Sequence, residues 1–182
     1  DETFTQSGND LTWSAEGKDI YYQGKTDKEL PVSVGIKYYL DGTEVSPDDL
    51  AGKTGHLKME VTYTNTSKTT KKVNGKNTEI YSPFVMVTGM ILSTDNFSNV
   101  TVDNGKVISD GSRNVVVGFG MPGMKDSLDM SSDIADEVDI PEGFTMEADV
   151  TDCEMSSAFT VALTDIFKDI DFDNIDGLDD LK

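Results

Sequence analysis

Acidic residues close to the C-terminal end have the spacing of a calcium-binding loop. Positions 1, 3, 5 and 12 of such a loop are held by Asp169, Asp171, Asp173 and Asp180. Alternating carboxylates supply the oxygen ligands that Ca²⁺ takes in loops of this kind. Two residues depart from the pattern, because Asn174 stands where a glycine makes the sharp turn and Asp176 replaces an apolar residue. Calcium is therefore the only cofactor that the sequence suggests.

The same segment has a second interpretation, which these departures favour. Ile175, Leu178 and Leu181 recur every three residues, as on one stripe of a helix. The acidic residues between them are typical of a solvated face. We therefore expect residues 166–182 to form an acidic linker and the start of a helical stalk, separate from a domain over residues 1–165.

Three aromatic residues near the N-terminus form the candidate ligand-binding group. Trp13, Tyr21 and Tyr22 could line an open face that stacks on sugar rings. Packing over the edge of the sandwich is the commoner fate of such a trio.

No group of residues predicts a reaction centre. His56 is the single histidine, so a zinc site has no second histidine ligand, and a catalytic triad would need Ser and Asp partners that only the fold could bring to it. Cys153 is the single cysteine, and the acidic residues around it are expected to raise its pKa and keep it inert. Paired carboxylates are abundant, and that abundance makes any one pair uninformative about glycoside hydrolysis. We expect a protein that is not an enzyme.

The glycine-rich stretch 118–123 superficially resembles a phosphate-binding loop. It lacks the Lys-Ser/Thr ending of such a loop and does not follow a βα pattern. A strand that turns sharply after Phe119 explains it better.

The charge excludes several partners. The chain has 34 acidic and 15 basic residues in 182, a formal charge of −19. Such a surface repels nucleic acid and anionic lipid. The lysine cluster, Lys68, Lys71, Lys72 and Lys76, lies beside a turn and is best read as a solvated hairpin tip.

Alternation of apolar and polar residues predicts an antiparallel β-domain. It is faultless over 57–65 and clear over 32–40, where Asp41-Gly42 then supplies a turn. Further strands are predicted around 115–119, 144–150 and 159–163. Many short strands with frequent turns favour an antiparallel β-sandwich of roughly eight to twelve strands.

Asn-Gly and Asp-Gly pairs predict the hairpins. Asn104-Gly105 lies between two apolar runs and gives the strongest hairpin signal, and Asn74-Gly75 and Asp110-Gly111 repeat it. Residues 46–52 carry a capping serine, a proline and a closing glycine, which predict one helical turn. Residues 127–138 are compatible with a short helix or an irregular loop.

The run 84–92 is apolar on both faces, unlike its neighbours. It predicts either a central strand covered on both sides, which we favour, or a strand that rests on a helix or a partner. An exposed edge of this strand would be our first choice for a contact surface.

Several stretches resemble a known family. Residues 29–42, the turn Ser46 to Gly55 and the strand ending Tyr63-Thr64-Asn65 are similar to the extracytoplasmic N-terminal region of the phage-infection-protein group of Gram-positive bacteria. Residues 176–182 look like the first of the Leu-x-x-Gly helical repeats that follow in that family. The resemblance implies a cell-surface location, with anchoring to the membrane by segments outside this sequence. It carries no catalytic residues to this chain.

We therefore expect a non-enzymatic extracytoplasmic domain that displays a surface for protein or envelope contacts. A carbohydrate-binding module and a calcium-dependent adhesion domain are the alternatives. The identity of the partner is left open.

Overall fold

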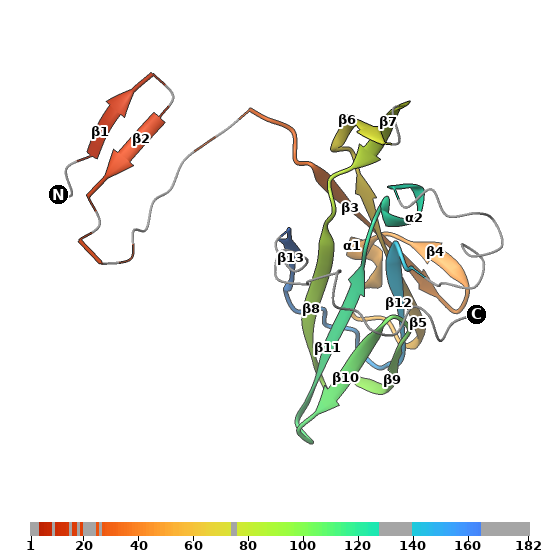
Figure 1. Ribbon diagram of the computed structural model, residues 1–182. Helices are drawn as coiled ribbons and strands as arrows, with labels where there is room; N and C mark the ends of the chain where they lie inside the picture. The colour runs from red at the N-terminus through yellow and green to blue at the C-terminus, as the bar shows by residue number, and fades with distance from the viewer. Residues whose placement is uncertain are drawn as a thin grey trace, which may run out of the picture. The chain divides into compact units, whose positions relative to one another are not determined.

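The fold is described from a computed structural model of the 182-residue chain (Figure 1). The structure describes residues 4–8, 10–14, 16–17, 19, 25, 27–73, 76–127 and 140–164. The chain divides into two compact units, Asp1–Leu30 and Pro31–Lys182. The sequence places residues 1–165 in one domain and gives no sign of this boundary.

The first unit contains a β-hairpin. Its strands, β1 (Phe4–Ser7) and β2 (Asp10–Trp13), pair antiparallel with Phe4 opposite Trp13. The two rings pack against each other, with centroids 5.8 Å apart and planes tilted by 39°.

The second unit contains two antiparallel sheets, as the alternation predicts. One sheet has five strands in the order β4 (Thr43–Val45), β3 (Val32–Leu40), β5 (Gly55–Asn65), β12 (Gly143–Val150) and β9 (Phe97–Val102). The other has four strands in the order β10 (Gly105–Ser109), β11 (Arg113–Gly120), β8 (Val85–Ser93) and β13 (Ala158–Leu163). The predicted β-sandwich is confirmed.

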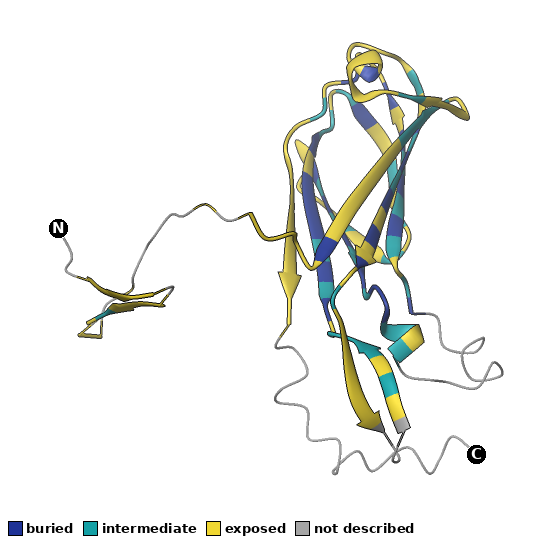
Figure 2. Cartoon of the chain, turned by 90° about the horizontal axis from the view of Figure 1, so that it is seen from above, coloured by how far each residue is buried: buried dark blue, intermediate teal, exposed yellow. Residues whose placement is uncertain are grey.

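The core lies between the two sheets (Figure 2). On β5 the alternating residues Leu57, Met59, Val61 and Tyr63 are all buried, which confirms the strand expected over 57–65. The facing β8 buries its own alternating residues in the same way. Each sheet therefore supplies one apolar face to a shared interior.

Two of the predicted hairpins are confirmed. Asp41 and Gly42 join β3 to β4 with φ of 50° and 80°, the left-handed values that a tight hairpin turn needs. Asp110-Gly111 joins β10 to β11, with Gly111 at φ 92°. The pair Asn74-Gly75 lies outside the described residues.

The hairpin predicted at Asn104-Gly105 is wrong. Asn104 does turn with a φ of 44°, but β9 pairs with β12 and β10 pairs with β11, so the chain crosses from one sheet to the other. The amide of Phe119 donates to the Asn104 carbonyl at 2.9 Å, and a Cβ on Gly105 would lie 2.3 Å from the Val117 carbonyl oxygen. The turn residues give the chain its bend, whereas neighbouring strands decide where each arm pairs.

The helical turn predicted over 46–52 is confirmed as α1 (Pro47–Leu50). Ser46 caps it, because its Oγ accepts a hydrogen bond from the Asp49 amide at 3.2 Å. Helix α2 (Met124–Ser127) precedes the segment expected to be a short helix or loop, of which only Ser127 is described.

The lysine cluster belongs to a hairpin, as expected. Strands β6 (Lys68–Val73) and β7 (Lys76–Tyr81) pair antiparallel, and Lys71 and Lys72 are exposed. Lys68 Nζ lies 4.6 Å from the centre of the Tyr81 ring.

Candidate protein-contact surface

Strand β8 is not covered on both sides by the described residues. Its inward residues Met86, Met90 and Leu92 are at most 3% exposed, whereas the outward Ile91 is 44% exposed. The favoured interpretation of the run 84–92, a central strand covered on both sides, is therefore correct about the central position but wrong about the outer cover for the part of the chain that the structure describes. Its edges are not free either, because β11 and β13 pair with them.

The outer side of the four-stranded sheet forms a broad apolar surface. Residues directly opposite in antiparallel strands point to the same side of a sheet, so the register gives its members. We call this surface the apolar face: Val85, Val87 and Ile91 of β8, Ile108 of β10, Val115, Val117 and Phe119 of β11, and Phe159, Val161 and Leu163 of β13. All of them are exposed or half-buried.

The apolar face also differs from the rest of the molecule in charge. The charged residues that point outward from these four strands are Lys106 and Arg113, and none is acidic. A chain of formal charge −19 thus keeps one sheet face free of carboxylates. Large apolar patches with a polar rim mark interaction sites on soluble proteins.

Phe159 anchors β13 on this face. It is 62% exposed, and its ring lies over Gly89 of the neighbouring strand β8. A Cβ at Gly89 would come within 2.6 Å of the ring. An aromatic ring that covers a strand glycine in this way holds the two strands in register.

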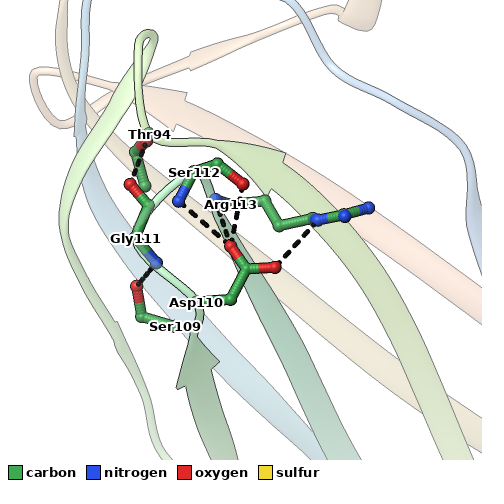
Figure 3. Close-up of polar contacts among 6 residues, drawn as sticks. All are labelled: Thr94, Ser109, Asp110, Gly111, Ser112 and Arg113. Atoms are coloured by element: carbon green, nitrogen blue, oxygen red, sulfur yellow. Dashed lines mark hydrogen bonds and ion pairs between the residues drawn. The ribbon is translucent and has the colours of Figure 1, made fainter.

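A hydrogen-bonded turn joins β10 to β11 at one end of the apolar face. Figure 3 shows its polar contacts. Asp110 Oδ1 accepts hydrogen bonds from the amides of Ser112 and Arg113, both at 3.0 Å, and from the Ser112 hydroxyl at 2.9 Å. Its Oδ2 accepts from Arg113 Nε at 3.0 Å. These hydrogen bonds lower the pKa of Asp110 to about 2, and the bond from the Ser112 amide contributes most.

Serine and arginine side chains surround an open depression beside this turn. It is lined by Ile91, Ser93, Ser112, Arg113, Ser156 and Ser157. The depression joins the apolar face through Ile91, so a ligand on the face would meet polar groups at this end.

The candidate ligand-binding and metal residues from the sequence are not brought together within the described residues. Trp13 lies in the first unit, half-buried against Phe4. Tyr21 and Tyr22 lie outside the described residues, as do Asp169, Asp171, Asp173 and Asp180. In the described part of the chain, no three His, Cys, Asp or Glu side chains lie close enough to hold a metal ion.

Cys153 is buried, being 2% exposed, and burial raises the pKa of its thiol. Neighbouring acidic residues were the expected cause of a raised Cys153 pKa, whereas in the structure the cause is desolvation of the thiol. The inert role expected for this cysteine agrees with its environment.

His56 has acidic neighbours on the outer side of the five-stranded sheet. Its side chain is 51% exposed, with Nδ1 3.0 Å from Asp149 Oδ1 and Nε2 3.8 Å from Glu147 Oε2. Asn99 Nδ2 donates to the other Asp149 oxygen at 2.7 Å. The hydrogen bond to Asp149, together with the negative charges of Asp149, Glu147 and Asp41, raises the pKa of His56 above 6.5.

We expect Asp149→Asn to lower the pKa of His56 towards 6.5, since it removes the hydrogen-bonded carboxylate. Because the folded pKa is raised, this pair stabilises the fold fully below pH 6.5, and the stabilisation is lost as pH rises through the raised pKa. NMR titration of the single histidine measures the pKa directly. Glu147→Gln, which removes the more distant carboxylate, should lower it less. A wild-type pKa at or below 6.5 would contradict the geometry.

Comparisons with known proteins add no family. No protein-family model, curated protein or solved structure matches the chain. Within the described residues, no helix is long and apolar enough to cross a membrane.

The sequence missed the apolar face, although part of its signal was present. The run 84–92 showed apolar residues on both sides, and the strand at 159–163 carries no charge. What the sequence lacked was the order β10-β11-β8-β13, which places these outward residues on one surface.

Proposed function

We propose that this chain is a non-enzymatic, extracytoplasmic binding domain of a bacterial cell-envelope protein, and that it holds a protein partner through the apolar face. The observation that carries the proposal is a broad apolar surface without a single outward acidic residue, on a molecule of formal charge −19. Apolar side chains of this number are costly to leave in water, and a protein surface is the usual cover.

The envelope location rests on the resemblance of residues 19–65 and 176–182 to the phage-infection-protein group. A single buried cysteine and a strongly acidic surface are compatible with that location. The high negative charge also keeps the domain away from anionic lipid headgroups, which leaves proteins as the contacts that the apolar face fits best.

Site-specific photocrosslinking in a Gram-positive host tests this function. A photoreactive amino acid in place of Val117, at the centre of the apolar face, should give a discrete protein adduct in the envelope. The same amino acid in place of Thr62, exposed on the outer side of the five-stranded sheet, is the matched control and should give none.

Equal adducts from the two positions, or none from Val117, would contradict the proposal. Adding Val115→Asp to the Val117 variant should abolish the adduct, because a carboxylate would then have to be buried in the contact.

A further inference from the structure

One side of the sandwich is closed and the other is open. The inter-sheet packing places β10 opposite β9 and β11 opposite β12. Tyr63 of β5 hydrogen-bonds Thr88 of β8 at 2.7 Å, so these strands face each other as well. The strand orders then place β13 opposite β3. The crossover at residues 103–104 closes the β9/β10 side.

Strand β3 exposes apolar side chains that point inward. Val34 stands opposite Tyr63 and Ile36 opposite Val61 in the β3–β5 register, so both point to the core side. Tyr63 and Val61 are buried, yet Val34 and Ile36 are each 41% exposed. Nothing in the described residues covers them to the extent that the rest of this sheet face is covered.

Strand β13 is open on the same side. Its inward residues Ala158, Thr160 and Ala162 are small and exposed, although Thr160 Oγ1 lies 2.7 Å from Thr88 Oγ1 of the core. We call the space between the inward residues of β3 and β13 the open seam. It is lined by Val34, Ile36, Ala158, Thr160 and Ala162.

The backbone of β13 has a free edge along this seam. Among the described residues it pairs only with β8, so one of its two edges has no strand partner. Unpaired strand edges are usually guarded by charge, shortness or a bulge. The other edges of the described sheets differ: β10 carries Lys106, β4 has 3 residues, and the β9 register shifts against β12. The part of β3 that β4 leaves unpaired, residues 32–37, ends in the charged Lys37. The 6 residues of β13 include no charge and no proline.

We propose that the open seam takes an extended segment of another protein, which pairs with the free edge of β13 and inserts alternating apolar side chains between the layers onto Val34 and Ile36. Only an extended backbone satisfies a row of strand donors and acceptors, and its period of two sends every second side chain inward. The inference deepens the proposed function, since it names the kind of protein segment bound, and it uses a different surface from the apolar face.

Charge argues for the origin and composition of this segment. A second copy would bring a further formal charge of −19 against the first. A neutral or basic strand is instead attracted by the acidic body, with a strength that falls as salt is raised. The occupant that fits is therefore an alternating apolar strand flanked by basic residues.

The test uses a synthetic peptide of alternating valine and threonine with a lysine at each end, added to the full chain. Calorimetry should show saturable binding that weakens with salt, and hydrogen exchange should show slower exchange of β13 amides. Ile36→Gln should weaken binding at least about tenfold, a loss of roughly 1.4 kcal/mol. Thr62→Gln is the matched control, because Thr62 is a β-branched residue exposed on the outer side of the five-stranded sheet, away from both the seam and the apolar face, and it should bind as wild type does.

Each other outcome overturns the inference in a recognisable way. Absence of binding, or equal binding by Ile36→Gln with unchanged β13 exchange, removes the seam as a site. Binding lost in Val117→Gln but kept in Ile36→Gln assigns the peptide to the apolar face, which supports the proposed function alone. A dimer in sedimentation that Ile36→Gln dissociates assigns the seam to a second copy. Ile36→Val, which keeps the apolar contact, should bind nearly as wild type does and guards against misfolding of the glutamine variant.

Discussion

Phe144→Ala is expected to lower the free energy of unfolding by about 3–5 kcal/mol, the range for removing a buried phenylalanine. Phe144 is 3% exposed and its ring lies over Gly118 of the opposite sheet. A Cβ at Gly118 would lie 2.3 Å from Phe144 Cγ, much closer than van der Waals contact allows. Gly118→Ala should therefore cost about 1–3 kcal/mol by overpacking. Urea unfolding of both variants measures the two values.

The double variant sharpens this prediction. With the ring removed, the new methyl group enters the vacated space, so Gly118→Ala/Phe144→Ala should cost less than the sum of the single changes. Gly35→Ala is the matched control, because its nearest neighbour would be the Thr62 carbonyl oxygen at 3.8 Å. It should change stability by no more than about 0.5 kcal/mol. Strict additivity of the two core changes would mean that the ring does not rest on Gly118.

This glycine shows what a local pattern leaves out. The stretch 118–123 superficially resembles a phosphate loop, and the favoured explanation, a strand that turns sharply after Phe119, agrees with the end of β11 at Gly120 and the turn at Pro122-Gly123. In the structure Gly118 and Gly120 lie within β11 and point inward. At Gly120 a Cβ would meet both the Gly143 amide and the Tyr63 ring at 2.8 Å. Close packing of the two layers explains both glycines, and no sequence window contains the residues across the sandwich that require them.

Strands and their turns could be predicted from the sequence, because period-two alternation and Asp-Gly chemistry are local. The faultless alternation of 57–65 became β5, and Asp41-Gly42 became the turn into β4. Pairing partners could not be predicted in the same way. Asn104-Gly105 has the residues of a hairpin, yet its two arms belong to different sheets. That choice depends on β11 and β12, which follow later in the chain.

The candidate sites were harder to predict, because both consist of apolar side chains that no other described part of the chain covers. The apolar face consists of residues that would be ordinary core residues if a third layer covered them. Likewise Val34 and Ile36 belong to an alternation that predicts burial, and only the position of β3 opposite a free edge leaves them exposed. Hydrophobic pattern identifies the side chains that need cover, but the tertiary fold decides which of them receive it from their own chain.

The distribution of charge is relevant to both the apolar face and the open seam. Carboxylates are spread over the outer side of the five-stranded sheet, for example at Glu147 and Asp149 beside His56. They are missing from the outward positions of the four-stranded sheet and from all of β13. A basic partner attracted by the acidic side would therefore dock on this face through apolar contacts, since the charged groups there are Lys106 and Arg113.

Leu50→Ala is expected to cost about 2–5 kcal/mol, because it empties a fully enclosed site at one end of the sandwich. Leu50 is 1% exposed although it belongs to a helix of only 4 residues. The segment around it is fixed to the loop after β12, since the Gly52 amide donates to the Cys153 carbonyl at 2.9 Å and the Cys153 amide donates to the Lys53 carbonyl at 2.8 Å. These bonds prevent the helix from moving inward to fill the cavity, which favours the upper part of the range.

Urea unfolding of Leu50→Ala beside Ile108→Ala tests this prediction on two aliphatic residues of equal size. Ile108 is 53% exposed, so its truncation should change the free energy of unfolding by no more than about 0.5 kcal/mol. The dependence of that free energy on urea should be unchanged in both variants, because neither alters how much surface unfolding exposes. Similar costs for the two changes would mean that α1 does not close the core. A loss confined to Leu50→Ala would place this four-residue helix among the elements that hold the two sheets together, which its length alone does not suggest.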